Sequence, residues 1–168
     1  MHHGVSGRSS DAVLAITRRV ILVIVLIAMI GLLGELLLIE HFEDAWQLVP
    51  VVLLVLGVVA VAWHARAPSV SSARTLRVLM TLCVLSGLLG VLLHYRGNVE
   101  FVLEENRGAT RWVLFREAMM GATPALAPGA MIQIGLLGLL YGFLTRTAKM
   151  TDVRIQNSEF RKHRPGNI

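Results

Sequence analysis

The chain has 168 residues, enough for a single domain. Hydrophobic residues make up 55% of it and charged residues 16%, whereas soluble globular domains carry about 25% charged residues, so the composition excludes an ordinary soluble domain. The single cysteine, Cys83, excludes an internal disulfide and the cysteine-based zinc and redox motifs. The net charge of +5 would suggest nucleic acid in a soluble protein, but its distribution along the chain indicates membrane topology instead.

Four apolar stretches are long enough to cross a bilayer. A helix needs about 20 mostly apolar residues to cross about 30 Å of hydrocarbon, and it satisfies its own backbone hydrogen bonds there. We therefore predict an all-α membrane protein, a bundle of four transmembrane helices between residues 20 and 146. The predicted spans are residues 20–39, 48–65, 76–95 and 125–144.

Basic residues fall mostly on one side of these spans. Twelve of the sixteen lysines and arginines precede the first span, join the second to the third, or follow the fourth. Cytoplasmic segments carry such an excess, so we expect both termini to be cytoplasmic. Residues 1–19 form the N-terminal segment in this interpretation, and residues 147–168 form a basic tail that lies on anionic headgroups or stays solvated.

The outer loop, residues 96–124, is the one sizeable segment between spans. Alternation of apolar and polar residues over 99–103 is a weak strand-like signal, whereas residues 110–120 read as a short helix. Trp112, Phe115 and Met119 share one face of that helix. We expect it either to lie on the membrane interface or to cap the outer end of the bundle.

A Gly-Leu-Leu-Gly motif occurs at residues 31–34, 87–90 and 135–138. The first two copies continue alike, which suggests that the chain consists of two related helical hairpins. Glycine lets helices approach closely, and small residues four apart are the usual sign of such packing. The residues that we expect to pack helices together, within the bundle or in a homo-oligomer, are Ala28, Gly31, Ser86, Gly87, Gly90, Gly138 and Gly142.

Two ionisable residues end small-residue faces at similar depth. Glu35 lies on the face of Ala28 and Gly31, and His94 lies on that of Gly87 and Gly90. If the faces meet, Glu35 and His94 could form a buried pair, which would be a proton relay, a transported-ion site or part of a metal site. The alternatives are a structural pairing or placement of these side chains toward water.

A metal or acidic cluster at the outer end is a further hypothesis. Its residues would be Glu40, His41, Glu43, Asp44 and Glu100, because histidine and carboxylates together ligate zinc, manganese or iron. An ideal helix would point His41 about 120° away from Glu35, so the two are not expected to share a site. No spacing matches a known metal motif, and no cofactor is predicted.

Residues 93–101 (LHYRGNVEF) and 121–129 (GATPALAPG) resemble stretches of small uncharacterised bacterial membrane proteins with four spans. The resemblance covers the second half of the chain and implies a bacterial inner-membrane location without an activity.

No enzyme motif is present in the sequence. The leading expectation is a non-enzymatic accessory or assembly subunit of an inner-membrane complex, or a homo-oligomer, with the bilayer and other membrane subunits as partners. The alternatives are a small ion- or proton-coupled transporter that uses Glu35 and His94, and a membrane protein that binds a metal or cofactor.

Overall fold

The computed structural model describes residues 3–41, 43–120 and 126–162, and the side chains of these between residues 12 and 147. This part of the chain is helical, without strands. The five helices are α1 (His3–Leu38), α2 (Ala45–Arg66), α3 (Val70–Glu105), α4 (Arg111–Met120) and α5 (Leu126–Lys162). Four of them are long and apolar enough to cross a membrane: α1, α2, α3 and α5. The prediction of an all-α protein with four membrane-spanning helices is confirmed at this level.

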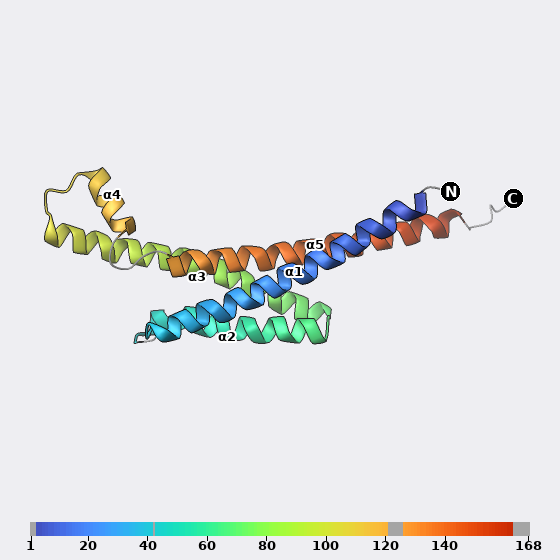
Figure 1. Ribbon diagram of the computed structural model, residues 1–168, viewed down its shortest axis with the longest axis horizontal. Coiled ribbons are helices and arrows are strands. Elements are labelled where there is room, and N and C mark those ends of the chain that lie inside the picture. The colour runs from blue at the N-terminus through green and yellow to red at the C-terminus, as the bar shows by residue number, and fades with distance from the viewer. Residues whose placement is uncertain (1–2, 42, 121–125, 163–168) are drawn as a thin grey trace.

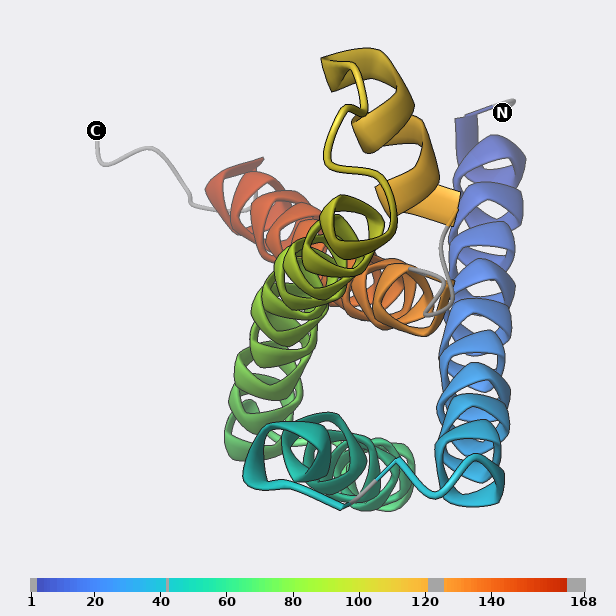
Figure 2. The same ribbon diagram turned by 90° about the vertical axis from the view of Figure 1, so that its left-hand side faces the viewer.

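The four long helices alternate in direction, and the start of α1 lies at the same end of the molecule as the end of α5 (Figure 1). Viewed along its length, the molecule has the four helices around a ring (Figure 2). The pairs in contact are α1 with α2, α2 with α3, α3 with α5, and α5 with α1, and the contact between α3 and α5 is the most extensive. We call the end with the start of α1 the terminal end and the opposite end the pocket end.

Local sequence fixes where the shorter connections lie. Asp44 caps α2 by accepting hydrogen bonds from the backbone N–H groups of Trp46 and Gln47. At the other end of α2, Pro68 disfavours helical geometry at Ala67, whose φ of −136° and ψ of 76° are not helical. Ser69 then caps α3 through a capping box with Ser72. The turn between α2 and α3 is therefore only a few residues long.

Glycines set the close contact between α3 and α5. A Cβ atom on Gly87 would lie 2.6 Å from the carbonyl oxygen of Pro128, and one on Gly135 would lie 2.6 Å from the carbonyl oxygen of Met80. Further along, a Cβ on Gly138 would collide with the Met80 side chain. Later residues of α5 contact earlier residues of α3, so the two helices are antiparallel. Each of these glycines leaves room for the backbone or a side chain of the other helix.

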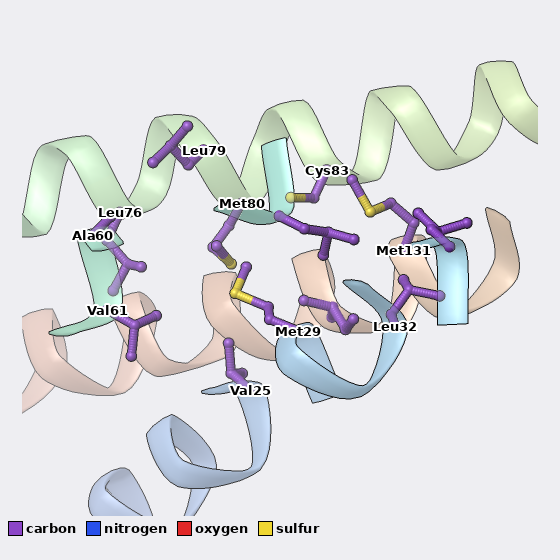
Figure 3. Close-up of a cluster of buried hydrophobic side chains, with 13 residues drawn as sticks. Val25, Met29, Leu32, Ala60, Val61, Leu76, Leu79, Met80, Cys83 and Met131 are labelled. Carbon is purple, nitrogen blue, oxygen red and sulfur yellow. The ribbon is translucent and has the colours of Figure 1, made fainter. Parts of the chain in front are cut away.

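The core fills the ring between the four helices (Figure 3). Met29, Leu54, Met80 and Cys83 have no exposed surface, and Met131 has 1%. The side chains of Met29 and Met80 meet beside Gly57, whose missing side chain provides the space. Unbranched methionines fill irregular gaps well, and here they close the middle of the bundle.

Helix α3 extends beyond both ends of the predicted span, residues 76–95. At about 1.5 Å per residue, the 36 residues of α3 extend about 54 Å, well beyond about 30 Å of hydrocarbon. The strand-like interpretation of residues 99–103 was wrong, because these residues are helical. Extending an existing helix costs little, whereas a strand would have had no partner in the described chain. The predicted start of the fourth span, residue 125, lies outside the described residues.

Helix α4 packs along the projecting part of α3. The side-chain amide of Asn98 donates a hydrogen bond of 2.8 Å to the carbonyl oxygen of Ala118, and both residues are buried. Trp112 and Phe115 of α4 are exposed, with their ring centroids 5.9 Å apart, and the Phe115 ring also lies 6.3 Å from that of Tyr95 on α3. The helix expected near residues 110–120 is therefore present, folded back against α3.

We expect Gly135→Ala to destabilise the fold by about 1–3 kcal/mol, because the new methyl group would collide with the Met80 carbonyl, which cannot move independently of α3. The measurement is thermal or denaturant unfolding in detergent. Gly31→Ala is the matched control, since no atom lies within 4 Å of the position of its Cβ. Equal stability of the two variants would contradict the close contact.

Candidate functional site

A pocket of about 620 Å³ lies between the four long helices at the pocket end. Its wall includes residues from α1, α2, α3, α5 and the turn after α1. Leu32, Leu36 and Met131 belong both to this wall and to the buried core, so the core forms the floor of the pocket. The polar side chains of the wall are those of Glu35, His41, Asp44, Gln47, Ser86 and His94.

The turn after α1 brings His41 to this pocket. The backbone N–H of His41 donates to the carbonyl oxygen of Leu36 at 2.9 Å, and that of Glu40 donates to Leu37 at 3.2 Å. Glu40 has a φ of 54°, so these bonds form a Schellman motif with glutamate where glycine is usual. The chain therefore folds back over the last turn of α1 instead of continuing along its axis.

His41 and Glu35 both line the pocket wall, although they were not expected to share a site. That expectation assumed an ideal helix through residue 41, whereas α1 ends at Leu38. The imidazole ring of His41 is stacked on that of His94, with centroids 6.2 Å apart and an interplanar angle of 16°.

Glu35 and His94 line the same pocket without forming a direct pair. Among the described residues, Glu35 has no ion pair and no side-chain hydrogen bond, and His94 contacts His41 instead. The glutamate side chain is exposed and His94 is half-buried. The pocket thus contains an unpaired carboxylate on one wall and two stacked imidazoles on another.

The residues of the suggested metal cluster do not come together. Within the described residues, no three His, Cys, Asp or Glu side chains are close enough to hold a metal ion. Glu43 and Glu100 are exposed and lie outside the pocket wall, as does Glu40. Asp44 lines the pocket, but its Oδ1 atom caps α2.

The residues expected to pack helices lie in four different settings. Gly87, Gly90, Gly138 and Gly142 lie along the contact between α3 and α5. Ala28 packs against the core, and Ser86 is half-buried in the pocket wall. Gly31 faces open space, as does Gly34, although both belong to the same repeated motif as Gly87 and Gly90.

A buried polar network lies at the terminal end of α2. The Nδ1 atom of His64 is 2.8 Å from Ser72 Oγ, and its Nε2 atom is 3.0 Å from the Tyr141 hydroxyl. His64 is 4% exposed and Ser72 is fully buried. The backbone N–H of Ser69 also donates to Ser72 Oγ, which in turn approaches the Ala67 carbonyl oxygen. The network therefore joins α2, α3 and α5.

This network was not found from the sequence. Its three residues come from three helices, and only packing brings them together. Ser69 and Ser72 have the spacing of a capping box, and His64 interrupts an apolar run, so two local signals were available.

Searches of protein-family models, of curated proteins and of solved structures each found no match to this chain. The residues and geometry described above therefore carry the functional argument.

Replacing Tyr141 by phenylalanine should destabilise the fold by about 0.6–1.7 kcal/mol, because one ring nitrogen of His64 would lose its partner inside the bundle. Unfolding in detergent measures the effect. Tyr95→Phe serves as the control, since no hydrogen bond of the Tyr95 hydroxyl is found among the described residues. In a protein that already carries His64→Leu, Tyr141→Phe should lower the free energy of unfolding much less. An unchanged effect would refute the coupling between His64 and the Tyr141 hydroxyl.

Proposed function

We propose that this protein is a small cation- or proton-coupled membrane carrier whose binding site is the pocket between its four long helices. The observation that supports this proposal most strongly is the position of Glu35. An ionisable group within a membrane-spanning helix is costly unless it is paired or hydrated, and such groups usually mark an ion or substrate path. Glu35 is unpaired among the described residues and lines a pocket together with His94.

The shape of the pocket favours a carrier over an open channel. Residues from all four long helices form its wall, while fully buried Met29 and Met80 fill the bundle beyond its floor. These buried side chains separate the pocket from the terminal end in this conformation. Transport would require the methionine side chains and at least one helix to rearrange, as alternating access demands.

We further propose that both termini face the cytoplasm and that the protein resides in a bacterial inner membrane. The excess of lysine and arginine at the terminal end supports this orientation. The exposed indole of Trp112 supports placement of α4 at the outer membrane interface, where aromatic rings with a polar N–H or O–H are favoured, and the exposed ring of Phe115 adds apolar surface beside it. The pocket would then open toward the outer side.

We expect Glu35→Gln to reduce coupled transport at least roughly tenfold, the effect of about 1.4 kcal/mol, because the pocket would lose its unpaired charge. The measurement uses proteoliposomes that contain a pH-sensitive dye, with inorganic and organic cations added outside in turn. With the wild type, one class of cation should drive proton flux.

Glu100→Gln is the control for this experiment, since it removes an exposed carboxylate that does not line the pocket. Its flux should equal that of the wild type. The carrier proposal fails if no cation drives proton flux through the wild-type protein. It also fails if folded Glu35→Gln protein retains full flux.

A second candidate function is that of a subunit in a homo-oligomer or a larger membrane complex. The supporting observation is Gln133 on α5, whose side chain is exposed within a candidate span and has no hydrogen-bond partner among the described residues. An amide in hydrocarbon gains from a partner on a neighbouring chain.

For this candidate, native mass spectrometry in mild detergent should show an oligomer. Gln133→Leu should weaken it by about 0.6–1.7 kcal/mol, the range for hydrogen bonds between membrane helices. Val78→Leu, another exposed but apolar position, should leave it unchanged. A wild-type protein that is monomeric throughout would count against a self-assembling subunit.

A further inference from the structure

The pocket is too large for an inorganic ion alone. A water molecule occupies about 30 Å³ in the liquid, and a bare monovalent metal ion is smaller still. The pocket measures about 620 Å³, which lies within the range of about 300–1,000 Å³ for sites of drug-sized organic ligands. Its volume therefore indicates an organic molecule or a heavily hydrated ion.

The residues of the pocket wall favour an organic molecule over a hydrated ion. Most of its residues are apolar, including Leu32, Leu36, Leu93 and Met131. Such surfaces offer no hydrogen bonds to a hydration shell, whereas they favour hydrocarbon or aromatic groups. The indole of Trp46, which is 66% exposed, also lines the pocket and can stack on rings or on a cation.

The polar groups of the wall favour a positive charge on the ligand. No lysine or arginine is among the residues that line the pocket, whereas the carboxylates of Glu35 and Asp44 are. Asp44 uses only Oδ1 to cap α2. The wall therefore holds two carboxyl groups and no lysine or arginine side chain, which favours a cationic ligand.

We propose that the ligand of this pocket is an amphiphilic organic monocation, whose charged centre pairs with Glu35 and whose apolar groups contact the leucines and Met131. This inference rests on the proposed carrier function and specifies its substrate class. An ionised carboxylate that faces an apolar space is stabilised by such a ligand, which supplies the counter-charge without requiring a hydration shell.

Equilibrium binding of radiolabelled tetraphenylphosphonium to the full chain in mild detergent tests this proposal. This probe is a permanent monocation with an apolar surface. We expect saturable binding by the wild type, at least roughly tenfold weaker binding by Glu35→Gln, and recovery in Glu35→Asp, which keeps the charge. Glu100→Gln should bind like the wild type. Triphenylphosphine oxide, an uncharged analogue, should compete at least roughly tenfold less well.

Three outcomes would overturn the proposal. They are the absence of saturable binding by the wild type, unchanged binding by folded Glu35→Gln, and equal competition by the neutral analogue, which would indicate a site for uncharged apolar molecules. The two proposals fail in different ways. Proton flux driven only by an inorganic cation, without phosphonium binding, would refute the ligand class and leave the carrier. Phosphonium binding that depends on Glu35, without flux for any cation, would refute the carrier and leave the binding site.

Discussion

The close contact between the backbones of α3 and α5 is the constraint on which the rest of the structure depends. It exists because Gly87 and Gly135 face a carbonyl oxygen of the opposite helix, where any side chain would collide. With this pair fixed, α1 and α2 close the ring from the other side. The methionines then fill the middle, while the region beyond them is left hollow at the pocket end.

The site depends on how one helix ends. Had α1 continued to residue 41, His41 would have pointed away from Glu35. The Schellman motif, with Glu40 in a left-handed conformation, turns the chain back so that the imidazoles of His41 and His94 stack. A residue with a side chain in this conformation is strained relative to glycine, by about 1–2 kcal/mol. The strain at Glu40 is thus coupled to the geometry of the pocket wall.

Much of the fold could be predicted from the sequence, because the bilayer admits few solutions. A long apolar run must be helical, so the number of spans followed from length and composition alone. The end of α3 could not be predicted in this way, because outside the membrane both helix and strand are allowed. In the structure this part of α3 stays helical and packs against α4, with a hydrogen bond from Asn98 to Ala118, a tertiary contact that local sequence does not reveal.

The candidate site was predicted only in part. The small-residue faces indicated that Glu35 and His94 point toward protein, and both line the pocket. Their relation to His41 depended on backbone geometry that helical projection cannot provide. The repeated Gly-Leu-Leu-Gly motif was no guide to packing, since Gly31 is open while Gly87 is tightly enclosed. Identical local sequence therefore has different roles, determined by the helix that lies opposite.

The network of His64, Ser72 and Tyr141 has a mechanical consequence for the first helix. It fastens α2, α3 and α5 to one another by hydrogen bonds, whereas no side-chain hydrogen bond in the described part of the chain joins α1 to another helix. The contacts of α1 are apolar, and lipid tails can replace them at little cost. Helices α2, α3 and α5 are therefore joined by polar contacts, whereas α1, the helix that carries Glu35, can shift relative to them without breaking a side-chain hydrogen bond between described residues.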